Sequence, residues 1–302
     1  MLLKRSNAIM LGILFSCLFT SIAVSGAETF SFSSYKDIDD LFEKMGYTKA
    51  AWDKGIREVP PVFLTNIPNR WRGTNSKEVS TKYKKALFFR LLGPGVLHCN
   101  KQILAEREQL LLLSKKKTTN NKDAAWLLKL AQKYRVVGDT DATVNSQHIK
   151  QLLVRVDSVP PSLALAQGAD ESGWGTSRFA AEGNSLFGQH ATTKNTQSIA
   201  AKGTTAVKMT AFDEPLDSIA SYMLNLNSNS GYRELREKRA QLRQEGKKVT
   251  GLVLVDTLIH YSERGSEYTN DLKNIIQVNY LEATDNASLA ETPSIELVPV
   301  TQ

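Results

Sequence analysis

The chain has 302 residues, of which 41% are hydrophobic and 23% are charged, as in an ordinary globular protein with room for one large domain or two small ones. Its formal net charge is +7 at pH 7. This basic excess is compatible with an anionic partner such as the cell wall, a membrane surface or nucleic acid, but it is too small to choose among them.

The first 27 residues are predicted to be a secretory signal. Lys4 and Arg5 precede an apolar run that ends near Val24, and Ser25-Gly26-Ala27 supplies the small residues that signal peptidases prefer. The apolar run is short for a membrane-spanning helix. The alternative to cleavage is that the segment is retained as a signal anchor. The residues around Cys17 do not favour lipidation. We therefore expect an exported protein of the periplasm or cell envelope.

Without the signal the chain keeps one cysteine, Cys99, so no intrachain disulfide can form. The four histidines are dispersed, and His98 and Cys99 point in different directions on a helix. We predict a buried Cys99, no metal site and no cofactor.

Residues 28–75 are expected to be an irregular N-terminal arm. The spacing from Ile38 to Met45 is helical, but Pro60-Pro61 and Ile67-Pro68 indicate extended chain. Within it, Val62-Phe63-Leu64 is expected to dock on the body of the protein.

Residues 76–144 are predicted to be a helical extension. Apolar residues recur at helical spacing from Val79 to Leu91, Gly93-Pro94-Gly95 is expected to break the helix, and a second helix runs from Val96 to about Ser114. The lysine triplet that follows is typical of a solvated helix end, so it does not indicate a nucleic-acid site.

Residues 145–281 are predicted to form the main domain, and residues 282–302 a disordered tail. The fold class is mainly α, with one small β-hairpin in 189–210. The helices expected in this region, and one just before it, cover residues 122–135, 146–157, 160–171, 177–181, 216–227, 231–245, 249–261 and 267–280.

One carboxylate in this region stands out. A helix that begins at Pro160-Pro161, capped by Ser158, carries small and apolar residues as far as Ala169 and then ends in Asp170-Glu171. Burial and the dipole at a helix C-terminus both disfavour negative charge there, so they raise the pKa of Glu171 and suit it to general acid catalysis. The alternative, a surface residue in a helix-ending loop, is equally compatible with the spacing.

Two motifs carry a family resemblance: Glu171-Ser-Gly-Trp-Gly-Thr-Ser and Asn184-Ser-Leu-Phe-Gly188. With Tyr222 and the segment Tyr261–Tyr268, they resemble the peptidoglycan N-acetylglucosaminidases of glycoside hydrolase family 73, in particular their Bax branch. The resemblance covers roughly residues 145–280 and, more weakly, 86–111. It implies a lysozyme-like α+β fold with the hairpin after the catalytic helix. It also implies cleavage after N-acetylglucosamine in wall glycan, with Glu171 as proton donor.

The same resemblance makes Trp174, Asn184, Phe187 and Tyr261 candidates for substrate contact. Trp174 is equally suited to plug the core and Asn184 to cap a turn, while Phe187 fits packing better than contact. The phenol of Tyr261 is placed to position the sugar, and Tyr268 is expected to be structural.

The sequence does not decide the identity of the second catalytic group, because residues 189–212 contain no Asp or Glu. The candidates outside that range are Glu182, Asp213 and Asp170. Three mechanisms are open. One of these carboxylates activates water, as in inverting hydrolysis, or the acetamido oxygen of the substrate attacks the sugar carbon. In the third, the protein is a weak or degenerate enzyme. We slightly favour the acetamido route.

We therefore predict an endo-β-N-acetylglucosaminidase acting on peptidoglycan glycan strands, monomeric, without a nucleic-acid partner and with proximity to the membrane left open. A lytic transglycosylase and a non-catalytic wall-binding protein are the alternatives.

Overall fold

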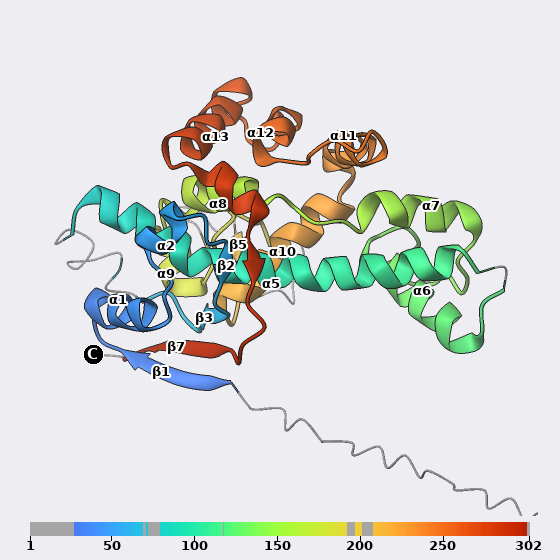
Figure 1. Cartoon of the computed structure of the whole chain (residues 1–302). Helices are drawn as coiled ribbons and strands as arrows, with labels where there is room; N and C mark the ends of the chain where they lie inside the picture. The colour runs from blue at the N-terminus through green and yellow to red at the C-terminus, as the bar shows by residue number, and fades with distance from the viewer. Residues whose placement is uncertain are drawn as a thin grey trace, which may run out of the picture.

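The long helix α5, Thr81–Ser114, runs through the middle of the computed structural model, and the other elements are grouped around it (Figure 1). The structure describes residues 27–68, 71, 79–116, 118–191, 197–200 and 208–300. This part of the chain is mainly α, as predicted. The predicted signal lies outside the described residues except for Ala27. No helix in the described ranges is both long and apolar enough to cross a membrane.

Helices α6 and α7 lie at the C-terminal end of α5, α12 and α13 lie over α8, and α11 lies next to the end of α10 (Figure 1). The helices after α5 are α6 (Asn121–Lys133), α7 (Ser146–Arg155), α8 (Pro161–Ser172), α9 (Arg178–Gly183), α10 (Pro215–Ser228), α11 (Arg233–Gln244), α12 (Gly251–Leu254) and α13 (Ser266–Val278). Short 3-10 turns are η1 (Ser230–Tyr232), η2 (Val255–Leu258) and η3 (Leu281–Asn286).

The predicted break at Gly93-Pro94-Gly95 is wrong, because α5 continues through it. A proline inside a helix removes one backbone hydrogen bond and costs roughly 3 kcal/mol. Packing offsets that cost here, since the helix is buried on both sides of Pro94, at Leu92 and Val96. A Cβ at Gly95 would lie 2.7 Å from Cδ1 of Ile219, so the glycine lets α10 approach α5 closely.

The described part of the N-terminal arm is folded, so its prediction as irregular chain is wrong there, whereas the helical spacing from Ile38 to Met45 is confirmed by α1. It contains β1 (Glu28–Phe32), α1 (Tyr35–Lys44), α2 (Lys49–Asp53), β2 (Glu58–Val59) and β3 (Val62–Leu64). Ser34 and Asp37 form a capping box that starts α1. Strand β3 contacts α5, as the docking prediction required.

The prediction of a disordered tail at 282–302 is also wrong for the described residues. Strands β1 and β3 both pair in parallel with β7 (Ile295–Pro299), which is the middle strand of the sheet, and β2 pairs with β6 (Ser288–Leu289). Leu297 of β7 is fully buried. The partners of this strand lie at the other end of the chain, so no local pattern around residue 295 announces it.

The predicted hairpin is present as β4 (Ser198–Ala200) paired antiparallel with β5 (Lys208–Thr210). Two helix details differ from prediction. The expected helix 249–261 is only the short α12 followed by η2. Ser158 does not cap α8, because the N-cap position is Pro160, two residues later.

Candidate active site

Helix α8 carries Glu171 near its C-terminal end and is buried along most of its length. Leu163, Ala166 and Ala169 are fully buried. Helices α5, α12 and α13 and the turn η3 all contact it. The helix ends at Gly173, which has the left-handed φ of 55° that commonly terminates helices. The position of Glu171 is therefore set by the core of the protein.

The first turn of α8 is capped by a residue from the C-terminal segment. The Asp285 carboxylate accepts hydrogen bonds from the Ser162 backbone N–H at 2.8 Å and from the Ser162 hydroxyl at 2.7 Å. It also accepts one from the Gly251 N–H at 3.2 Å. Negative charge is favourable at a helix N-terminus, so Asp285 supplies the cap that α8 lacks in its own sequence.

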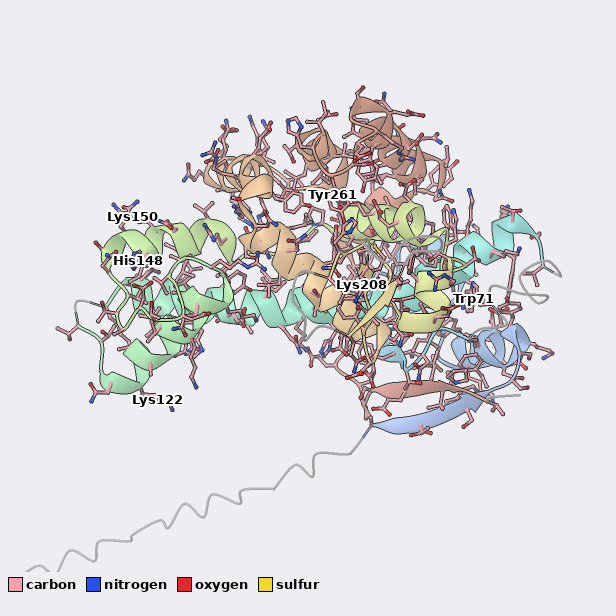
Figure 2. The ribbon with its side chains drawn as sticks, turned by 180° about the vertical axis from the view of Figure 1, so that it is seen from behind. Trp71, Lys122, His148, Lys150, Lys208 and Tyr261 are labelled. Carbon is pink, nitrogen blue, oxygen red and sulfur yellow. The ribbon has the colours of Figure 1, made fainter. Side chains whose placement is uncertain are left out.

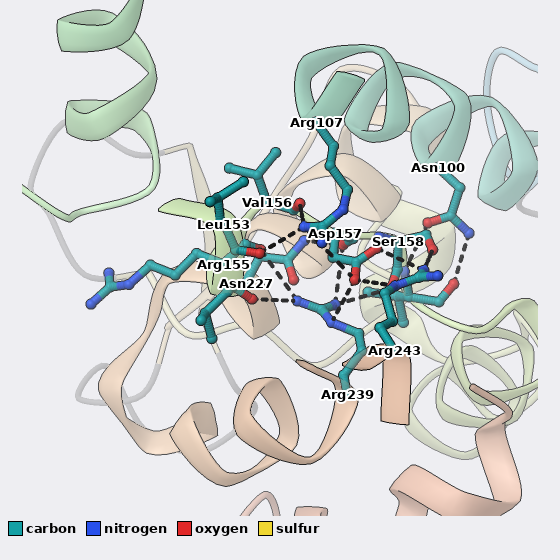
Figure 3. A network of polar contacts seen from close by, with 12 residues as sticks. Asn100, Arg107, Leu153, Arg155, Val156, Asp157, Ser158, Asn227, Arg239 and Arg243 are labelled. Atoms are coloured by element: carbon teal, nitrogen blue, oxygen red, sulfur yellow. Dashed lines mark hydrogen bonds and ion pairs between the residues drawn. The ribbon is translucent and has the colours of Figure 1, made fainter. Parts of the chain in front are cut away.

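The chain just before α8 is held by a buried charge network around Asp157 (Figure 3). Arg243 binds the carboxylate with two nitrogens, the Nη2–Oδ1 distance being 2.7 Å. Arg239, whose side chain is fully buried, lies 3.7 Å from Oδ2, and Arg107 lies 3.9 Å from it. Arg107 and Arg239 also donate to the last backbone carbonyls of α7, so the junction of α7 and α8 is tied to α5 and α11.

The Glu171 carboxyl is partly buried at the opposite end of α8. Burial raises its pKa, and the neighbouring charge of Asp170 adds to the rise, whereas a hydrogen bond with Tyr268 and the charge of Arg264 lower it. A Cβ at Gly188 would lie 2.7 Å from Oε2 of Glu171, so the turn that ends at Gly188 packs directly on the carboxylate. A carboxyl with a raised pKa can keep its proton near neutral pH and give it to a substrate.

Four tyrosines, here called the tyrosine cluster, surround this carboxyl: Tyr222, Tyr232, Tyr261 and Tyr268. Burial raises the pKa of all four phenols, and the charge of Glu171 raises each further. The rings of Tyr261 and Tyr268 are parallel with centroids 5.4 Å apart, and Tyr232 lies 5.6 Å from Tyr261. Figure 2 shows Tyr261 beside α8, far from Lys122 and Lys150 at the other end of the molecule. The cluster provides neutral hydroxyl groups and ring faces around one carboxyl.

Comparison with known proteins identifies the family. The family model for glucosaminidase, described as mannosyl-glycoprotein endo-beta-N-acetylglucosaminidase, matches residues 146–281. Protein bax of Escherichia coli (strain K12) is 32% identical over 199 residues, which are 65% of this chain and 70% of that protein. The chain belongs to the glucosaminidase family. A crystal structure of the catalytic domain of the autolysin Auto from Listeria monocytogenes matches with 15% identity and a TM-score of 0.33, over 57% of this chain and 93% of that one.

In this glucosaminidase-family chain, the side chain of Asn184 forms hydrogen bonds within the protein. It has a left-handed φ of 51° at the end of α9 and is buried. Its side-chain oxygen accepts from the Ile67 N–H at 3.0 Å, and its nitrogen donates to the Asp213 carbonyl at 2.9 Å and to the side chain of Asn66. These contacts favour the alternative interpretation of Asn184, a turn cap that also ties down the N-terminal arm, while substrate contact stays a prediction.

Phe187 and Trp174 pack within the protein. Phe187 is buried and stacks on Tyr222 with ring centroids 3.9 Å apart, which favours packing over substrate contact, as the sequence indicated. Trp174 lies edge-on to Phe88 and Phe89, and the Lys85 ammonium lies 4.5 Å from its ring centroid. These contacts favour the core-plug interpretation of Trp174.

Tyr261 lies near Glu171, whose charge raises the pKa of its phenol, and its hydroxyl donates to the Phe187 carbonyl at 3.1 Å. Among the candidate second carboxylates, Asp170 raises the pKa of Glu171 and pairs with Arg264 at 3.1 Å. Glu182 is exposed and pairs with Arg178 at 2.9 Å. Asp213 is exposed at the start of α10.

The sequence analysis missed three contributors to the site: Gln167, Gly188 and Arg264. Gln167 lies four residues before Glu171, and that spacing places both on one face of a helix. Gly188 closes the motif that was recognised, but its contact with the carboxylate requires knowledge of the tertiary turn. Tyr268 was expected to be only structural, yet it bonds with Glu171.

A cavity of about 50 Å³ lies elsewhere, between the N-terminal arm, α5 and α10. Phe63, Leu64 and Trp71 are part of its lining, and the described lining contains no carboxylate. It is therefore unsuited to glycosidic chemistry. Within the described residues, no group of three His, Cys, Asp or Glu side chains is arranged to hold a metal ion.

Proposed function

We propose that this chain is an exported endo-β-N-acetylglucosaminidase that cleaves the bond after N-acetylglucosamine in peptidoglycan, with Glu171 as general acid. The observation that carries the proposal is the environment of Glu171: a partly buried carboxyl beside phenols, whose pKa is raised by burial although the charge of Arg264 acts against the rise. Family membership supports the glycosidase class and the wall-glycan substrate.

The chemistry needs a proton for the leaving oxygen while positive charge develops on the sugar ring. Glu171 supplies the proton. Tyr261 and Tyr232 present ring surface next to it, and sugars bind on aromatic faces of this kind. The ionised carboxylate left after proton transfer is stabilised by the hydroxyl of Tyr268.

For the second group we favour the acetamido oxygen of the substrate. Glu182 is paired with Arg178, Asp213 is exposed, and residues 189–212 contain no acidic residue. Intramolecular attack retains the anomeric configuration, whereas a carboxylate that activates water inverts it. Proton NMR of the first product formed distinguishes the two: a β-anomer supports the acetamido route and an α-anomer excludes it.

The decisive experiment is mass spectrometry of purified sacculi digested with the wild type, Glu171→Gln and the exposed control Glu291→Gln. We expect soluble fragments with reducing-end N-acetylglucosamine from the wild type and the control, and none from Glu171→Gln. Undiminished release by Glu171→Gln would refute the role of the carboxyl. Ends of the 1,6-anhydromuramic type would indicate a lytic transglycosylase, and sacculus binding without any product would indicate a wall-binding protein.

Export is a separate part of the proposal. It is supported by the basic and apolar segment in residues 1–27 and by the wall-glycan substrate of the family. Cell fractionation of the full chain and of a chain lacking residues 1–27 tests it. The full chain is expected in the envelope fraction, and equal distribution of the two would contradict export.

A further inference from the structure

Gln167 connects two members of the tyrosine cluster beneath Glu171. It is fully buried on α8, one turn before Glu171. The Tyr222 hydroxyl lies 2.6 Å from its Oε1, and its Nε2 lies 2.9 Å from the Tyr268 hydroxyl. The Tyr268 hydroxyl is in turn close enough to the Glu171 carboxyl to lower its pKa as a hydrogen-bond donor. The result is a continuous chain of polar contacts from α10 through α8 to α13 and back to the end of α8.

All the hydrogen bonds in this series of contacts can form in only one orientation of the Gln167 amide. A phenol has a single hydrogen to donate, and the described contacts give the buried Tyr222 hydroxyl one acceptor, Oε1 of Gln167. That bond turns Nε2 of Gln167 toward Tyr268, whose oxygen must then accept. The hydrogen of Tyr268 is left for Glu171. A flipped amide would leave the Tyr222 hydrogen buried without a partner, at a cost of about 1–3 kcal/mol.

We propose that Tyr222 and Gln167 are positioning residues, which act through Tyr268 to keep its hydroxyl directed at the Glu171 carboxylate as a hydrogen-bond donor. This inference rests on the proposed role of Glu171 as general acid. The donor holds the carboxylate in one orientation and stabilises the ionised form that remains once the proton has gone to the leaving group.

The opposing effects on the pKa of Glu171 explain why a hydrogen-bond donor held in this position is useful. Burial and the charge of Asp170 favour the protonated acid, and both make the proton harder to release to the leaving group. The Tyr268 hydroxyl and the charge of Arg264 oppose them. The other groups near the carboxyl are the phenols of Tyr222, Tyr232 and Tyr261, which burial keeps protonated. Removal of a single hydroxyl therefore changes hydrogen bonding without changing the charge of the site.

The test is carried out on the full chain with Tyr222→Phe, Tyr268→Phe and the matched control Tyr134→Phe. Tyr134 is also buried, and its hydroxyl donates to Glu106 at 2.7 Å in a different part of the molecule. Titration of ¹³C-labelled glutamate carboxyls by NMR, with the Glu171 signal assigned from Glu171→Gln, follows the pKa of Glu171 directly. The pH profile of kcat/KM on solubilised glycan strands gives the second measurement.

We expect Tyr268→Phe to raise the pKa of Glu171, because a donor to the ionised form is lost. Tyr222→Phe should raise it in the same direction by a smaller amount, because the Gln167 amide is then free to turn. The alkaline limb of the activity profile should move to higher pH in both variants, whereas Tyr134→Phe should match the wild type. A Tyr222→Phe titration identical to the wild type would overturn the proposal.

The wild type offers a further test that needs no variant to fold. The Gln167 amide protons should show nuclear Overhauser contacts with the ring protons of Tyr268, and contacts with Tyr222 instead would refute the proposed direction. These measurements do not depend on turnover. An active Glu171→Gln would refute the proposed function while the titration and amide orientation stayed measurable, so the two hypotheses can fail separately.

Discussion

The two ends of α8 hold carboxylates in opposite surroundings. Asp157, just before the helix, is almost fully buried but lies within 4 Å of Arg107, Arg239 and Arg243. At the other end, no Lys or Arg nitrogen of the described residues lies within 4.0 Å of Glu171. One carboxylate is compensated by several cations, and the other faces neutral phenols.

The same functional group thus anchors the fold at one end and, in the proposed function, serves as the acid at the other. At Asp157 the arginines fix the ionised form, and the carboxylate ties α5, α8 and α11 together (Figure 3). At Glu171 burial opposes ionisation and the charge of Arg264 offsets it only in part, so the pKa is raised and the carboxyl keeps its proton to higher pH. The first end gives the helix its position, and with it the position of Glu171 at the second end.

Asp157→Asn tests the anchoring end and should give the largest effect. It leaves the fully buried guanidinium of Arg239 without its counter-charge. Loss of one partner from a buried pair costs about 3–5 kcal/mol, so the free energy of unfolding, measured by urea titration, should fall by that amount. Asp256→Asn, in an exposed pair with Lys273, should lose less than about 1 kcal/mol. Similar losses in the two variants would show that the network does not anchor α8.

Gly188→Ala tests the acid end. The added Cβ would lie 2.7 Å from Oε2 of Glu171, so the carboxyl must shift, and displacements of about 1 Å can lower activity by about 100-fold. Gly246→Ala is the matched control, because Gly246 has a similar φ of +64° and nothing within 4 Å of the new Cβ. Both variants should lose about 1 kcal/mol of stability to backbone strain. Only Gly188→Ala should lose kcat/KM on glycan strands, and equal activity in the two would contradict the contact.

The end of α8 that carries Glu171 was easier to predict from sequence than the end next to Asp157. Small and apolar residues to Ala169, followed by Asp170-Glu171, predict a buried helix that ends in a carboxylate, and the structure contains that helix. The anchoring contacts come from residues far apart in the chain, since Arg239 and Asp285 both follow α8 by many residues. A local pattern identifies Asp157 only as part of a helix start.

The errors in the predicted fold have the same physical origin. Pro94 breaks a helix by its local chemistry, but tertiary packing between α5 and α10 outweighs that chemistry. The strand Ile295–Pro299 looks like a tail until β1 and β3 are placed on either side of it. Long-range contacts, which no periodicity encodes, decide both.

Asp285→Ala tests whether the anchoring end depends on a cap from the C-terminal segment. It leaves the Ser162 N–H without its acceptor inside the protein, whereas the Gly251 N–H keeps the Ser162 hydroxyl, so we expect a loss of about 2 kcal/mol in urea unfolding. Activity per folded molecule should change little, because Glu171 lies at the other end of the helix. Glu291→Ala, in the same segment but exposed, is the control. A large loss of kcat/KM without a loss of stability would contradict this division between the two ends.

The smallest effect expected is a gain of stability when the acid is neutralised. Burial raises the pKa of Glu171 in the folded state above its ordinary value of 4.5, which applies to the unfolded chain. Below that value both states bind the proton. As the pH rises through the window between the ordinary and the raised pKa, the unfolded chain ionises first and the free energy of unfolding of the wild type falls. Glu171→Gln cannot ionise and escapes this loss. Its melting temperature relative to the wild type should therefore be higher at neutral pH than at pH values below the ordinary pKa. A difference between the two proteins that does not change with pH would show that the folded state does not disfavour the charge of Glu171, and the contrast with Asp157 would then be lost.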